Sequence, residues 1–85
     1  MEKITSAFVR YNKERRCYVL YTEFEHSDGW RGGRGGESIY TVDGTLVHIN
    51  LKLEPIAVYQ SRKDMKDRIT RKYGVELKWK QEDEE

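Results

Sequence analysis

Trp30, Arg31 and Arg34 are the residues whose types and spacing point most directly to a chemistry. A guanidinium group contacts phosphate through a planar fork of donors, and an indole ring stacks on nucleobases. All three lie within residues 26–37, a stretch that holds five of the seven glycines. Because a run this rich in glycine has no steric reason to fold alone, we expect a mobile loop between two strands. The pattern predicts phosphate contact and base stacking.

This stretch contains two short repeats of the same three residues. Arg31–Gly33 and Arg34–Gly36 each read Arg-Gly-Gly. Over these six residues the chain resembles the RGG segments of hnRNP-type RNA-binding tails, which fold or stack on binding. The resemblance implies an RNA partner contacted by the two arginines. The plain alternative is a flexible hairpin connection, in which the Trp30 ring folds back on the sheet.

A basic helix could extend the same phosphate-binding track. Ser61 and Gly74 are typical of the two ends of a helix, which we expect over residues 62–73. Asp64 and Asp67 each lie four residues before an arginine, so we expect them to form ion pairs with Arg68 and Arg71. Three cations without such a partner remain for phosphate contact, and they are Arg62, Lys63 and Lys66.

A third basic group lies at the first expected hairpin turn and contains Arg10, Arg15 and Arg16. If the glycine-rich loop, this turn and the helix flank meet in space, they form one cationic groove. Binding would then depend steeply on salt, because each neutralised phosphate releases counterions. Few side chains are available to read base edges, so we expect recognition of shape and backbone with little sequence preference.

Alternating apolar residues and turn signals predict the elements that position these groups. Asp43-Gly44 is a strong signal for a two-residue hairpin turn, which places Tyr40 opposite Val47. We expect Tyr40, Val42 and the odd-numbered residues 47–53 to share the buried face. Pro55 should end the ladder or lie at an edge, and residues 56–59 are ambiguous between a strand and the approach to the helix. The expected strands cover residues 4–11, 16–25, 38–42, 45–53 and 75–80.

These elements predict one α+β domain over residues 1–80, followed by an acidic tail at 81–85. The fold is an antiparallel sheet of four to five strands, made of two hairpins and a C-terminal strand, with one helix packed on a face. Cys17 is the single cysteine, so no internal disulfide forms, and its apolar setting predicts a small buried side chain. Neither a signal peptide nor an apolar run long enough to span a bilayer is visible, which favours a cytoplasmic protein.

Composition and spacing weigh against catalysis. The net charge of +1 rules out a uniformly basic coat, so any footprint must come from local segregation of charge. Glu23, Glu25, His26 and Asp28 form an acidic cluster with one imidazole, but no second histidine or cysteine lies at ligand spacing. Nor is a nucleophile with its base visible. We expect no enzyme, no cofactor and no metal.

The function we expect is non-catalytic binding of RNA or single-stranded nucleic acid, in a small protein that could modulate another nucleic-acid-acting protein. The alternative is a protein-binding inhibitor or adaptor of the phage or mobile-element accessory type, which acts by covering a partner's surface. In that case the acidic residues of 23–28 and the tail would contact a basic protein. A homodimer is expected in either case, because an 85-residue core is marginal.

Overall fold

The chain begins with three long strands and ends with a helix and one short strand. The computed structural model describes residues 2–80, so the acidic tail expected at 81–85 lies outside the described residues. The strands pair in the order β5-β4-β3-β2-β1-β6, and all pairs are antiparallel except β1 with β6. The elements are β1 (Glu2–Asn12), β2 (Cys17–His26), β3 (Arg31–Val42), β4 (Thr45–Ile49), β5 (Pro55–Tyr59), α1 (Arg62–Tyr73) and β6 (Leu77–Lys80).

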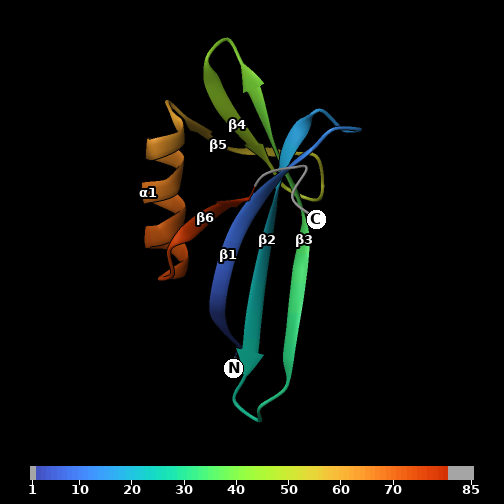
Figure 1. The fold of residues 1–85 in the computed structure, drawn as a ribbon, viewed down its shortest axis with the longest axis vertical. Helices are drawn as coiled ribbons and strands as arrows, with labels where there is room; N and C mark the ends of the chain where they lie inside the picture. The colour runs from blue at the N-terminus through green and yellow to red at the C-terminus, as the bar shows by residue number, and fades with distance from the viewer. Residues whose placement is uncertain (1, 81–85) are drawn as a thin grey trace.

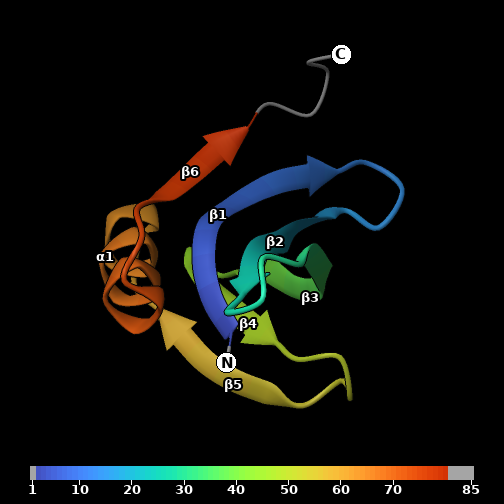
Figure 2. The same ribbon diagram turned by 90° about the horizontal axis from the view of Figure 1, so that it is seen from below.

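The predicted α+β class with one packed helix is confirmed, and the sheet is larger than expected. It has six strands, because β5 forms at one edge and β6 returns beside β1 in parallel at the other. Figure 2 shows that the sheet curls and that α1 lies between these two edge strands. The helix contacts both β5 and β6. We call the face of the sheet toward α1 the inner face, and the opposite one the outer face.

The helix follows its end signals. Ser61 Oγ accepts a hydrogen bond from the Asp64 N–H, and Gly74 ends the helix with a φ of 77°. Glycine suits this left-handed position, since a Cβ would strain it. Met65 and Ile69 form the buried stripe and pack against inner-face residues of the sheet. The predicted bounds of 62–73 are confirmed. The buried inner-face residues of the strands in this core are Ala7, Val9, Leu20, Ile39, Leu46, Tyr59 and Leu77.

The β3–β4 hairpin has the predicted register but the opposite orientation. Tyr40 pairs with Val47 as expected, yet Leu46 and His48 are the β4 residues that point into the core. The prediction that Tyr40, Val42 and the odd-numbered residues of 47–53 face the core was wrong. The outward residues of this hairpin are also apolar, so apolar alternation alone could not distinguish the two faces.

The strand expected to reach residue 53 ends at Ile49. The Asn50 side chain accepts hydrogen bonds from the N–H groups of Lys52 and Glu54, which closes a turn. Leu53 takes a φ of 64° in this turn and is 82% exposed. Asparagine side chains bond the backbone two residues on and so compete with a strand. The chain then enters β5 at Pro55, on a sheet edge as its missing N–H requires.

The glycine-rich stretch is mostly a strand and not a loop. Residues 31–42 form β3, and the connection from β2 is only a short turn. Strand pairing is possible because neighbouring aromatic rings cover the glycines, a device that offsets their missing side chains. A Cβ on Gly32 would lie 2.9 Å from the Phe24 ring, and one on Gly35 would lie 2.4 Å from Tyr21. Gly36, with a φ of 121°, is the extra residue of a β-bulge opposite Leu20 and Tyr21.

Strands β1, β2 and β3 together extend beyond the rest of the molecule as a long arm. Figure 1 shows the turn between β2 and β3 at the far end of this arm, well away from α1. The base of the arm joins the curled sheet, where β6 lies beside β1. The arm therefore presents two faces to solvent, and each carries aromatic side chains.

Candidate nucleic-acid interface

The end of the arm holds an aromatic cluster on the inner face, which we call the tip cluster and which comprises Phe24, His26 and Trp30. The Trp30 ring centroid lies 4.9 Å from that of His26 and 5.7 Å from that of Phe24. The Trp30 N–H donates to Asp28 Oδ1 at 3.1 Å, which fixes the turn. Trp30 is 57% exposed. The ring is therefore held in place rather than mobile, and one part of it remains open to a partner.

The two arginines next to this cluster already have carboxylate partners. Arg34 forms a forked pair with Glu2, with N···O distances of 2.7 and 3.2 Å, and its guanidinium lies 4.5 Å from the Phe24 ring centroid. Hydrogen bonding to Arg34 lowers the pKa of the Glu2 carboxyl from its usual value. Arg31, with 81% of its side chain exposed, lies 3.7 Å from Glu25. The charges of the tip are largely balanced within the arm.

The helix cations expected to lack partners have them. Lys63 pairs with Asp67 at 3.0 Å, and Lys66 pairs with Glu76 at 3.0 Å. Asp67 therefore pairs with Lys63, not with the Arg71 expected from spacing, whereas the Asp64–Arg68 pair is confirmed at 3.5 Å.

Arg62 also has a local contact. Its guanidinium lies 4.0 Å from the Trp79 ring centroid on β6. None of the three cations Arg62, Lys63 and Lys66 lies at the arm tip (Figure 1). Arg62, Lys63 and Lys66 therefore do not extend a cationic track from the arm tip, although Tyr73 at the other end of α1 lines a small pocket with Arg34.

A second aromatic group lies on the outer face at the base of the arm. Phe8 and Tyr21 face each other across β1 and β2, with ring centroids 5.2 Å apart and planes inclined by 20°. In the register of the sheet this pair continues to Lys78 on β6 and to Gly35 on β3. Four adjacent strands thus contribute one row of outward residues, which we call the outer row. It reads Lys78, Phe8, Tyr21 and Gly35.

Cations border the outer row on one side. Arg10 lies directly opposite Lys80 in the β1–β6 register, and Lys80 Nζ is 4.2 Å from the Phe8 ring centroid. Like charges in directly opposite positions are destabilising unless an anion lies between them. Within residues 2–80, no carboxylate lies at ion-pair distance from Arg10, Lys78 or Lys80. Arg10 and Lys80 form the basic border of the row, and Lys78 adds a third exposed cation at the end of the row itself.

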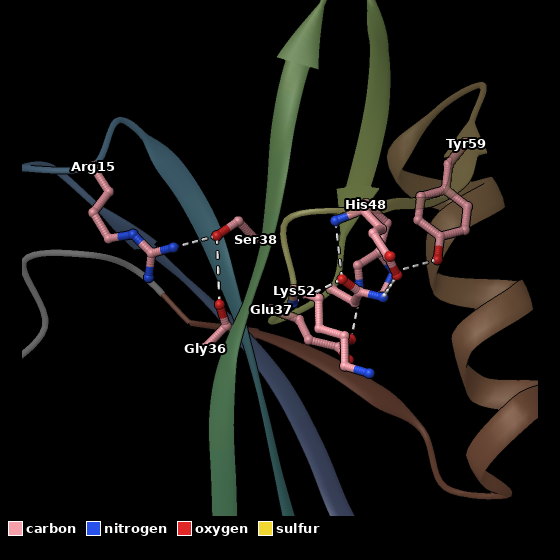
Figure 3. Close-up of polar contacts among 9 residues, drawn as sticks. Arg15, Gly36, Glu37, Ser38, His48, Lys52 and Tyr59 are labelled. Atoms are coloured by element: carbon pink, nitrogen blue, oxygen red, sulfur yellow. Dashed lines mark hydrogen bonds and ion pairs between the residues drawn. The ribbon is translucent and has the colours of Figure 1, made fainter.

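Arg15 adds a guanidinium to the same face. Figure 3 shows its side chain reaching from the turn after β1 to Ser38 on β3, where it donates to Ser38 Oγ. Ser38 is opposite Val19 on the outer face, one step beyond the outer row. Arg16 lies in the same turn with a φ of 57°. The structure therefore places the predicted hairpin cation Arg10 beside β6 and Arg15 against β3, and neither of them contacts the helix in the described residues.

The opposite border of the outer row is acidic. Glu23 on β2 accepts a hydrogen bond from Ser6 Oγ at 2.6 Å and lies opposite Gly33 of β3. A surface hollow of about 530 Å³ lies beside the part of β1 that precedes its pairing with β6. Phe8, Lys78 and Lys80 are among its lining residues. The outer face thus changes from basic to acidic along the arm, with aromatic rings between.

A buried series of hydrogen-bonded polar side chains lies on the inner face of the sheet and has a structural role. His48 Nδ1 lies 2.7 Å from the Tyr59 hydroxyl, and His48 Nε2 lies 2.7 Å from Glu37 Oε1 (Figure 3). Burial lowers the pKa of His48, although the Glu37 carboxylate opposes this shift. With His48 only 2% exposed, a substrate has no access to its imidazole. This series clamps β3, β4 and β5 together.

Sequence reasoning missed Phe8, Tyr21, Lys78 and Lys80. Alternation already placed Tyr21 opposite the apolar face of its strand, and it placed Lys78 and Lys80 on one side of the last strand. What could not be read was the neighbour relation, because β6 joins β1 in parallel from the far end of the chain. Long-range pairing of this kind leaves no local signal.

Comparisons with known protein families, curated proteins and solved structures found no match for this chain. Within residues 2–80, α1 is too short and too polar to cross a membrane. The same residues contain no group of three or more histidine, cysteine or carboxylate side chains placed to hold a metal ion. Functional inference therefore depends on the geometry of the two aromatic groups.

Proposed function

We propose that this protein is a non-catalytic binder of RNA or other single-stranded nucleic acid, and that the outer row is its contact surface. The observation that carries the proposal is the Phe8–Tyr21 stack beside Arg10 and Lys80, two opposed cations with no carboxylate between them in residues 2–80. Partly exposed rings next to cations that have no carboxylate partner among residues 2–80 suit bases joined to phosphates. A phosphate bound at this border would be attracted by both Arg10 and Lys80, which are neighbours in the β1–β6 register.

The chemistry favours unpaired bases over a duplex. Rings on a sheet contact the flat faces of bases, and those faces are covered in a double helix. The cations contact phosphate, which carries no sequence information. Binding should therefore tolerate many sequences and weaken as salt concentration rises.

The second candidate function is protein binding, as an inhibitor or adaptor, and the tip cluster is the observation that favours it. Trp30 is a large exposed ring held rigidly against His26. Tryptophan and arginine are enriched at the energetic centres of protein interfaces. Because Arg34 is already paired with Glu2, this surface attracts phosphate weakly and suits a partner with an apolar pocket.

Fluorescence anisotropy with labelled ten-nucleotide oligouridylate and oligothymidylate, and with a duplex of equal length, tests the main proposal. The triple variant Arg10→Ala, Lys78→Ala, Lys80→Ala should lose at least tenfold in affinity for both single strands. Its slope of log affinity against log salt should fall by about 2, from three lost phosphate contacts at about 0.7 each.

The matched control is Lys52→Ala, Lys63→Ala, Arg71→Ala, which removes the same charge from exposed positions elsewhere. It should keep its affinity within about threefold of the parent protein. Equal losses in the two triple variants would show that only net charge matters. Absence of binding to either single strand, with the protein folded, would contradict the proposed function.

A further inference from the structure

We infer the path and footprint of the bound strand, an inference that rests on the proposed function. The segment is short and unpaired, and it crosses the β-strands along the outer row. Its bases lie over Phe8, Tyr21 and Gly35, and its phosphates lie over Arg10, Lys80 and Arg15. Gly35 is the positioning residue, because its bare backbone lets the Tyr21 ring lie across β3.

Gly35 controls the position of the Tyr21 ring. A Cβ at Gly35 would lie 2.4 Å from Tyr21 Cδ1 and 2.7 Å from Cε1, far inside van der Waals contact. Gly35 is not among the glycines with a positive φ, so its backbone suits any residue. Alanine there would be tolerated by the strand but would displace the ring. A displaced ring breaks the stack with Phe8 and the surface on which a base would lie.

Charge fixes the side on which the phosphates run. Cations of β1, β6 and the β1–β2 turn border one side of the row, whereas Glu23 borders the other. A phosphate chain laid on the Glu23 side would be repelled by that carboxylate. The favourable path therefore runs perpendicular to the strands, with its phosphates toward Lys80 and Arg15.

The width of the row limits how many nucleotides it contacts. Four strands at a spacing of about 4.8 Å span roughly 14 Å between the outermost two. The row holds two rings, Phe8 and Tyr21, with the bare backbone of Gly35 beside them, which leaves room for two or three bases. The ligand class is accordingly an unpaired stretch of two or three nucleotides, in RNA or DNA, within or at the end of a longer strand.

Gly33 provides a matched control on the same strand and the same face. A Cβ there would lie 3.4 Å from the Thr22 carbonyl oxygen and 4.0 Å from the Glu23 side chain, which is ordinary contact. Gly33→Ala and Gly35→Ala thus make the same change in composition two residues apart. Only the second displaces an aromatic ring. Comparing the two separates a loss of the stack from a general stiffening of β3.

The experiment measures affinity for oligouridylates and oligothymidylates of two to twelve nucleotides by isothermal titration, with the melting temperature of each variant recorded. Gly33→Ala should stay within twofold of the parent protein, and Gly35→Ala should lose at least fivefold. If Gly35→Ala does not fold, Tyr21→Leu removes the ring while keeping the glycine and should show the same loss. The affinity should rise steeply as the oligonucleotide lengthens from two to three nucleotides, and it should then level off.

The possible failures are distinguishable. Binding by the parent protein with equal affinities for the Gly33 and Gly35 variants would overturn the role of Gly35. A steep rise continuing to twelve nucleotides would overturn the short footprint. In both cases the proposed function would stand. Lack of binding at every length by the folded parent protein would overturn the proposed function itself.

Discussion

The arm carries two aromatic groups on opposite faces, and they differ mainly in what surrounds their cations. At the tip cluster, Arg34 is paired with Glu2 and Arg31 with Glu25. On the outer row, Arg10 and Lys80 lie side by side without a carboxylate among residues 2–80. The tip holds the residue types typical of RNA-binding tails, yet its charges are already balanced. Residue type alone therefore does not identify the nucleic-acid surface.

The difference has an energetic consequence. A phosphate that approaches Arg34 must displace Glu2, a forked and charge-assisted pair. One that approaches the outer row displaces no carboxylate of residues 2–80 and competes only with water and with the contact between Lys80 and the Phe8 ring. The same number of arginines and lysines can thus give very different affinities.

The largest effect should come from changing the charges of each surface in turn, by reversal on the outer row and by neutralisation at the tip cluster. Arg10→Glu with Lys80→Glu should lower affinity for oligouridylate by at least thirtyfold, because two attractive contacts become repulsive. Arg31→Ala with Arg34→Ala should change it less than threefold. Anisotropy titrations at two salt concentrations measure both. The opposite ranking would assign phosphate binding to the tip cluster.

Ring removal should give the next largest effect. Base–aromatic stacking is worth about 1–3 kcal/mol per base, so Tyr21→Ala should weaken binding roughly 5- to 150-fold. Trp30→Ala should weaken it less than twofold, since its ring lies on the inner face. Intrinsic fluorescence and thermal melting would establish that both variants fold. A larger loss from Trp30→Ala would place the bases at the tip.

Local rules explain which parts of this comparison the sequence could predict. The cap at Ser61, the stop at Gly74 and the Asp43-Gly44 turn depend on neighbouring residues only, and each formed as predicted. The buried position of Cys17 is also confirmed, at 1% exposed. These features need no knowledge of the rest of the fold.

The outer row needed information that the sequence does not hold locally. The glycine-rich composition indicated a loop. The stretch forms a strand because rings from β2 and from the turn before β3 cover Gly32 and Gly35, and the sequence does not show that these rings lie there. Asp67 lies four residues from both Lys63 and Arg71, so spacing alone could not show that it pairs with Lys63. The partner of Lys66 is Glu76, which lies beyond the end of the helix. Homodimer formation and protein binding stay predictions.

Removing the negative charge that pairs with Arg34 would further test the difference between the tip cluster and the outer row. Glu2→Gln keeps the size of the side chain but removes its charge and replaces one of the two acceptor oxygens of the fork with a donor NH2 group. If pairing is what keeps the tip from binding phosphate, affinity for oligouridylate should rise about two- to threefold, with a steeper salt dependence. The pKa of Glu2 is lowered by Arg34, so the pair should persist well into mildly acidic buffer. An unchanged affinity would mean that the geometry of the tip, and not its charge balance, excludes the strand.

The smallest effect on binding should come from pH, which acts on the buried chain of His48, Tyr59 and Glu37 that joins β3, β4 and β5. Burial lowers the pKa of His48, so the unfolded chain takes up a proton first as pH falls. Stability should therefore decline as pH falls below about 6.5, by at most about 1.4 kcal/mol per unit for this group. The decline should end once pH falls below the lowered pKa of the folded state.

Urea unfolding from pH 8 to pH 5 measures this change, and His48→Gln should remove the part that depends on the imidazole. Over the range in which the protein stays folded, the affinity of the outer row should stay nearly constant, because arginine and lysine keep their charge. A clear change in affinity over this range would show that groups other than these cations contribute to binding.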